Sequence, residues 1–71
     1  MSVLLNLRQA IAQKLTNKSD EDVKEMIVNS VDGDEMALPG LGVLFEMIWK
    51  QSDDAAKQQF IDTIQQQLKT T

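Results

Sequence analysis

The chain contains no cysteine, no histidine and no tyrosine among its 71 residues. Without cysteine it has no disulfide bonds, so it is not a small secreted scaffold held together by bridges. Structural zinc sites use cysteine and histidine, and nucleophilic triads and proton transfer at neutral pH usually depend on histidine. The composition therefore predicts that the protein is not an enzyme and has no metal site and no cofactor.

Long hydrophobic runs are also missing. The apolar patch near the N-terminus is interrupted by Asn6, Arg8 and Gln9, and no run approaches the roughly 20 apolar residues that a membrane-spanning helix needs. A signal peptide would carry its positive charge before an apolar core and a small-residue cleavage site after it, and neither is present. We expect a soluble intracellular protein with no membrane partner.

The length and the hydrophobic content indicate one small globular domain, residues 1–71. Hydrophobic residues make up 42% of the chain and charged residues 25%, which is far from the composition of disordered proteins. A chain of this size buries only about 60% of the surface that its unfolded form exposes. The core is therefore expected to be thin, and a homodimer is one way to add burial.

The net charge of −4 is unevenly distributed. Residues 1–18 hold three basic side chains and no acid, a charge of +3, whereas residues 19–35 hold seven acids and one lysine, a charge of −6. A nucleic-acid-binding protein needs several lysines or arginines on one face. Nucleic acid is therefore an improbable partner, and its only candidate contacts are Arg8, Lys14 and Lys18.

Apolar residues recur at helical spacing in four segments. The segments run from about Val3 to Leu15, from Ser19 to the turn at 32–34, from Pro39 to about Lys50, and onward from Ser52. Asn17 is suited to a left-handed helix cap, and Ser19 and Ser52 are suited to helix N-caps. The apolar stripes of the first and last segments are Leu4, Leu7, Ile11 and Leu15, and Ala56, Phe60, Ile61, Ile64 and Leu68. The pattern predicts an all-α fold, a small bundle of about four short helices around a central hydrophobic helix.

The acidic turn Asp-Gly-Asp-Glu at 32–35 raises the alternative of a calcium site. A calcium-binding EF-hand loop needs glycine at its sixth position and a bidentate glutamate at its twelfth. Counted from Asp32, those positions hold Ala37 and Val43. The template fails, so a solvated turn is the better interpretation.

The segment LPGLGVLFEMIWK, residues 38–50, contains the only proline and the only tryptophan. With Pro39 as the first helical residue, one apolar face and a second stripe leave mainly Glu46 and Lys50 for solvent. Its two glycines lack the lysine and hydroxyl residues of a phosphate-binding loop, so close helix packing is the expected role. A helix apolar on two sides must be covered on two sides. The candidate interaction face consists of Val43, Phe45, Met47 and Trp49.

LPGLGVLFEMIW at 38–49 resembles the signature segment of the small acid-soluble spore protein I family of spore-forming bacilli. NLRQAI at 6–11 is similar to the opening of that family, and the acidic second helix, the GDE turn and Lys69 lie at matching positions. The resemblance implies a minor protein expressed in the forespore during sporulation and resident in the spore core. The family has no assigned molecular activity, so the resemblance supplies no functional residues.

Three hypotheses for the activity remain open. The favoured one is a small helical structural or interaction module, with a second copy or another spore protein as its partner. An alternative is a DNA-associated protective protein, although the spore proteins that coat DNA form a different family. The other alternative is an amino-acid store degraded at germination, with the turn at 33–37 as the entry point for a protease.

Overall fold

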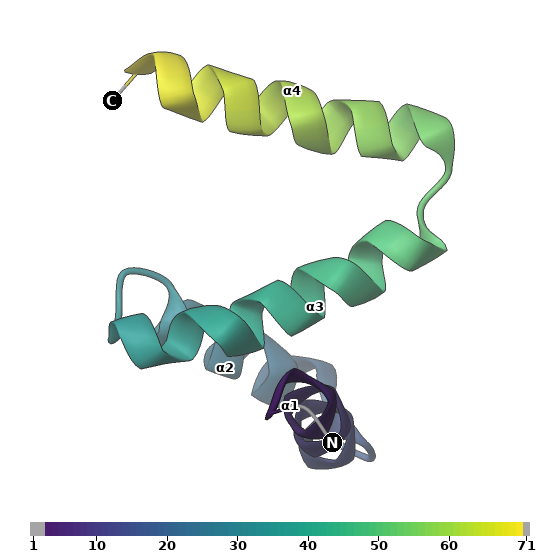
Figure 1. Cartoon of the computed structure of the whole chain (residues 1–71), viewed down its shortest axis with the longest axis vertical. Coiled ribbons are helices and arrows are strands. Elements are labelled where there is room, and N and C mark those ends of the chain that lie inside the picture. The colour runs from purple at the N-terminus through teal and green to yellow at the C-terminus, as the bar shows by residue number, and fades with distance from the viewer. Residues whose placement is uncertain (1–2, 71) are drawn as a thin grey trace.

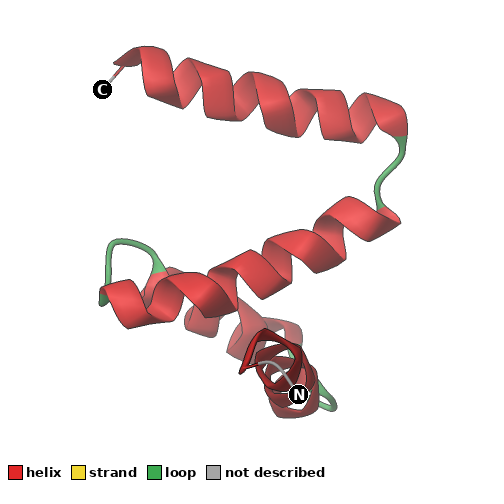
Figure 2. Cartoon of the chain, in the orientation of Figure 1, coloured by secondary structure: helices red, strands yellow, loops and turns green. Residues whose placement is uncertain are grey.

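The computed structural model describes the backbone of residues 3–70 and the side chains of residues 6–69. Within this part of the chain there are α-helices and a short 3-10 helix but no strand, which confirms the all-α prediction (Figures 1 and 2). The helices are α1 (Val3–Leu15), α2 (Asp20–Ser30), η1 (Glu35–Ala37), α3 (Leu38–Gln51) and α4 (Asp54–Thr70). The predicted stripe residue Leu4 has a side chain outside the described set.

The predicted central helix is α3. It packs against α1, α2 and η1, which together form one side of the molecule. Helix α4 turns back over α3 after a short connection and diverges from it toward the C-terminus (Figure 1). Near that connection Phe60 and Lys57 of α4 contact aromatic rings of α3.

The predicted caps between α1 and α2 are confirmed. Asn17 adopts a φ of 67°, the left-handed conformation that asparagine tolerates better than most residues. The Ser19 hydroxyl accepts a hydrogen bond from the Asp22 backbone N–H at 3.1 Å. Asp20, Glu21 and Asp22 occupy the first turn of α2, where negative charge is stabilised by the helix dipole. Much of the acidic cluster therefore stabilises a helix start.

The predicted cap of α4 at Ser52 is wrong by one residue. The Ser52 N–H still binds the Trp49 carbonyl at 3.2 Å and its hydroxyl donates to the Ile48 carbonyl at 2.6 Å, so this residue ends α3. Asp53 caps α4, since its Oδ1 accepts from the Ala56 N–H at 2.8 Å. Because the Ser52 hydroxyl is directed back to the Ile48 carbonyl of α3, the next residue supplies the cap of α4.

The core is as thin as the length predicts. Among the described residues Val43 is the one buried hydrophobic side chain, with 8% of its surface exposed. It lies on the side of α3 that faces α1, next to Leu7 and Pro39. The remaining interior is half-buried: Leu7, Ile11, Leu15, Val23, Met26, Leu41, Leu44, Trp49 and Phe60. The α1–α3 contact is therefore the best-packed part of the protein.

The two glycines of α3 differ in surroundings. A methyl group on Gly40 would meet the Ile11 Cδ1 atom at 3.6 Å, so this glycine faces α1. A methyl group on Gly42 would meet nothing within 4 Å. The expected role in close helix packing is therefore wrong for Gly42, because no neighbouring helix approaches it.

Replacing Gly42 by alanine should stabilise the protein. Alanine is favoured over glycine in a helix interior by about 0.5–1 kcal/mol, and the added methyl group has open space. Gly33→Ala is the matched comparison, because its Cβ would lie 2.9 Å from the Asn29 backbone oxygen and should destabilise the fold. Urea unfolding of both variants measures the difference. A Gly42→Ala protein less stable than the wild type would contradict the open environment.

Candidate interaction surface

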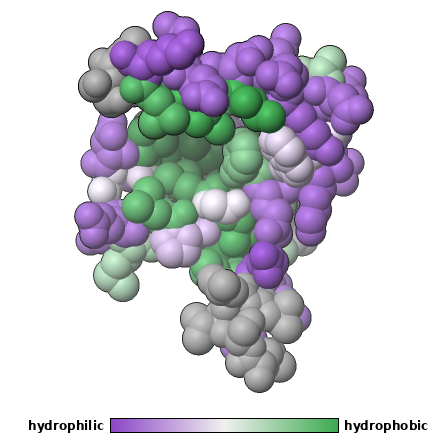
Figure 3. Space-filling view, turned by 45° about the horizontal axis from the view of Figure 1, so that its top comes forward, coloured by the Kyte–Doolittle hydropathy of each residue, from purple (hydrophilic) through white to green (hydrophobic). Residues whose placement is uncertain are grey.

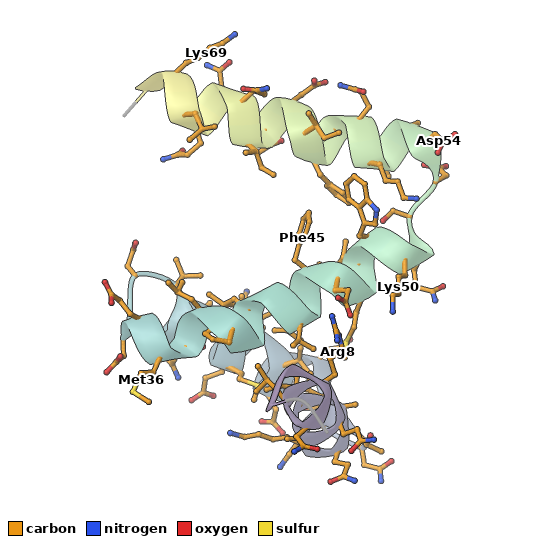
Figure 4. All side chains as sticks on the ribbon, viewed as in Figure 1. Arg8, Met36, Phe45, Lys50, Asp54 and Lys69 are labelled. Atoms are coloured by element: carbon orange, nitrogen blue, oxygen red, sulfur yellow. The ribbon has the colours of Figure 1, made fainter. Side chains whose placement is uncertain are left out.

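The structure divides the four predicted face residues between different sides of α3. Val43 is buried toward α1, whereas Phe45 points from α3 toward α4 (Figure 4). Trp49 lies beside Phe45, with the ring centroids 6.0 Å apart and the ring planes at 41°. Met47 keeps 39% of its surface exposed. Phe45 and Trp49 are thus brought together, and Val43 belongs to the core.

Aromatic contacts hold the start of α4 against α3. The Phe45 and Phe60 rings meet edge to face, with centroids 6.0 Å apart and planes at 68°. The Lys57 ammonium lies 5.3 Å from the centre of the Trp49 ring, within the range of a cation–π interaction. Edge-to-face pairs stabilise beyond their buried area. These contacts fix the angle between the two helices near their connection.

Beyond these contacts both helices expose large apolar side chains. We call this set the α3–α4 surface; it consists of Phe45, Ile48, Ile61, Ile64 and Leu68, which are 41%, 49%, 40%, 50% and 64% exposed. Figure 3 shows hydrophobic residues gathered in a hollow beside α4 with hydrophilic residues around it. Exposed apolar side chains that gather at a concave place and have a polar rim are typical of a binding surface.

The sequence predicts the α4 stripe but gives no reason to include it in an interaction face. The available signal is the spacing of four residues from Phe60 to Ile64. An apolar stripe buried within the bundle has the same spacing, so the signal does not distinguish a buried stripe from an exposed one. Which of these side chains α3 covers depends on the angle between the helices. Phe60 is half-buried, whereas Ile61 and Ile64 remain exposed.

An ion pair joins α1 to α3 on the side away from α4. The Arg8 guanidinium donates from Nε and Nη2 to the two carboxylate oxygens of Glu46, each at 2.8 Å, and Lys50 lies 3.7 Å from the same carboxylate. These hydrogen bonds raise the pKa of Arg8 above its ordinary value, and the negative charge of Glu46 adds to the effect. They lower the pKa of Glu46; desolvation opposes this shift, and the positive charges of Arg8 and Lys50 add to it.

Glu46 therefore has a role that helical spacing alone does not reveal. The spacing places it on the solvent side, but α1 crosses this side and brings Arg8 to it. Both side chains remain substantially exposed, 50% for Arg8 and 36% for Glu46, so the pair contributes little to the stability of the fold.

The three candidate nucleic-acid contacts do not form a free basic face. Arg8 is engaged by Glu46. Lys14 and Lys18 line one shallow pocket together with Asp22 and Glu25 of α2, so the positive charges there are balanced by negative ones. Counterion release from phosphates requires cations that are gathered without such neighbours.

The acidic turn has a local structural role. The Asp34 Oδ1 atom accepts a hydrogen bond from the Met36 N–H at 2.9 Å and caps η1. Across the described residues, no three histidine, cysteine, aspartate or glutamate side chains lie close enough to bind a metal ion together. In the same part of the chain no helix is long and apolar enough to span a membrane.

Comparison with known proteins places this arrangement in a family. The family model for "Small, acid-soluble spore protein I" matches residues 5–68. The chain belongs to the small, acid-soluble spore protein I family. The protein of that name from Geobacillus sp. (strain WCH70) is 44% identical over 66 residues, which cover 92% of this chain and 93% of the relative. That from Bacillus cereus (strain G9842) is 43% identical over 65 residues, covering 90% and 94%.

The match confirms the resemblance recognised in LPGLGVLFEMIW and shows that this chain is a small acid-soluble spore protein connected with sporulation. A small, acid-soluble spore protein I of Bacillus anthracis (strain CDC 684 / NRRL 3495) shares 42% identity over 65 residues. No solved structure matches the chain.

Proposed function

We propose that this member of the small, acid-soluble spore protein I family is a helical interaction module of the spore core that binds a protein through its α3–α4 surface. The observation that carries the proposal is the exposure of five large apolar side chains, between 40% and 64%, on two adjoining helices. Interface centres are apolar, rich in aromatic residues and poor in charge, with a polar rim around them. The hydrophobic hollow and its hydrophilic border match that description (Figure 3).

The role is one of binding and not of catalysis. Acid–base chemistry by carboxylates requires two acids that converge in a cleft. Asp34 and Asp53 instead cap helices, and Glu46 pairs with a base. Family membership supports the setting of the proposal, a protein made in the forespore and kept in the spore core. The DNA-associated and amino-acid-store alternatives stay predictions.

Site-specific photocrosslinking in spores tests the interaction. A photoreactive benzoylphenylalanine in place of Ile64, which is 50% exposed on the α3–α4 surface, should give a discrete crosslinked protein after irradiation. The matched control carries the same group in place of Gln66, which lies two positions on and so on the opposite side of α4. The control should give no discrete product, because that side faces solvent.

Fractionation of the irradiated spores locates the complex. We expect the crosslinked protein in the soluble fraction of decoated, broken spores, where core proteins are released. Equal labelling from positions 64 and 66, or no product from either, would overturn the proposed function.

A further inference from the structure

We infer that the partner on the α3–α4 surface is a second copy of the same chain, in a two-fold dimer that places α4 of each copy against the α3–α4 surface of the other. This inference rests on the proposed function and names the partner of the same surface. Each copy would supply both the hollow and the helix that occupies it. Such an arrangement is isologous, since identical residues meet across the axis.

The amount of exposed surface supports a partner of this size. The chain exposes 6122 Å². A compact folded monomer of 8.0 kDa is expected to expose about 4,500 Å², so the excess is about 1,600 Å² per chain. A stable interface of ordinary size needs only about 800 Å² from each partner. The excess exposed surface is thus enough for a complete interface. The thin core agrees with this, because the described part of the chain has one buried hydrophobic side chain.

The distribution of charge permits self-association through this part of the chain. The net charge is −4, but α4 carries Asp54, Lys57, Asp62 and Lys69, which sum to zero. Helix α3 carries only Glu46 and Lys50, which also sum to zero. The excess negative charge lies in residues 19–35 and at Asp53. Two copies that meet through α3 and α4 therefore avoid the like-charge repulsion that any interface through α2 would create.

The charges at the two ends of α4 fit a two-fold axis perpendicular to this helix. Two α4 helices related by such an axis run antiparallel, so the acidic start of one helix, Asp53 and Asp54, approaches the end of the other at Lys69. Opposite charges at these ends fix the register. An amphipathic helix with an apolar stripe is also the usual occupant of an apolar groove between helices, and α4 exposes Ile61 and Ile64 on such a stripe.

Mass measurement of the purified full-length chain tests the inference. Size-exclusion chromatography with light scattering should give twice 8.0 kDa at about 100 µM chain, because interfaces of this size have dissociation constants from micromolar downward. Ile64→Glu should raise the dissociation constant at least about 30-fold by placing an unpaired charge at the centre of the interface. Gln66→Glu adds the same charge on the outer side of α4 and should change the dissociation constant less than twofold.

Two further measurements keep the outcome decisive. Circular dichroism of each variant checks that the helices remain, and Ile48→Glu repeats the test from α3, where Ile48 is 49% exposed. A mass of 8.0 kDa at every concentration would overturn the inference, and so would a dimer whose dissociation constant is unchanged by Ile64→Glu and by Ile48→Glu. A monomer that still crosslinks another protein through position 64 in spores would leave the proposed function standing and remove only the second copy.

Discussion

Val43→Asp unfolds the protein at room temperature. Val43 is 8% exposed and lies at the α1–α3 contact, so an aspartate there would be buried beside Leu7. Arg8 lines the same pocket, but its guanidinium is already paired with Glu46. Burying an uncompensated charge costs several kcal/mol. The whole stability expected for 71 residues is about 4–10 kcal/mol, and a thin core places this chain near the lower end. The measurement is the loss of helical circular dichroism at 222 nm.

Two companion variants separate the effect of the charge from that of the helix. Val43→Ala removes apolar volume without adding charge and should cost about 1–3 kcal/mol in urea unfolding. Leu38→Asp introduces the same residue into the first turn of α3, where the native side chain is 58% exposed, and should be tolerated because the helix dipole favours it. Native helix content in Val43→Asp would show that the core lies elsewhere.

Phe60→Ala detaches α4 from α3. Phe60 supplies the edge-to-face contact with Phe45. Lys57, one turn earlier in α4, can stay over the Trp49 ring only while this part of α4 remains against α3. Truncating a packed phenylalanine costs about 3–5 kcal/mol when it is fully buried, so roughly 2–3 kcal/mol is expected for this half-buried one. A 17-residue helix without packing is marginal in water. The loss should therefore be confined to α4.

Hydrogen exchange and tryptophan fluorescence together measure this detachment. Amide protection across residues 54–70 should fall by about 30- to 150-fold while α1 and α3 keep theirs, because the helix opens as a local unit. Emission from Trp49, the only tryptophan, should shift to the red as its ring becomes hydrated. Gln59→Ala is the control, since its side chain is exposed and makes no ring contact. Equal loss of protection in all helices would show instead that α4 is part of one cooperative unit.

The predictions from sequence were most accurate where one residue decides the local backbone. Asn17 adopts the left-handed conformation and Ser19 caps α2, because each can satisfy backbone groups within its own turn. Ser52 was the exception. Serine and aspartate at 52–54 can all cap a helix, and the choice of Asp53 depends on where α3 ends. The residue that caps a helix therefore depends on the preceding segment as well as on the helix itself.

The interaction face was less accessible to sequence reasoning. Helical spacing shows that α3 is apolar on two sides, but it does not show which side α1 covers and which side α4 leaves open. Val43 and Phe45 are two positions apart and equally apolar, yet one is 8% exposed and the other 41%. Their difference arises from the directions of α1 and α4, which depend on packing between residues distant in the sequence, such as Ile11 with Gly40 and Phe45 with Phe60.

The sequence by itself determined the all-α class, the approximate position of each helix, the absence of cysteine and histidine chemistry, and the family through LPGLGVLFEMIW. Periodicity, capping chemistry and composition are local properties, so they can be read without coordinates. Only the tertiary structure decided that Val43 is the core, that Gly42 has no neighbour, and that α4 diverges to leave the α3–α4 surface exposed. Burial depends on the relative placement of helices, and the same amphipathic stripe fits several placements until long-range contacts select one.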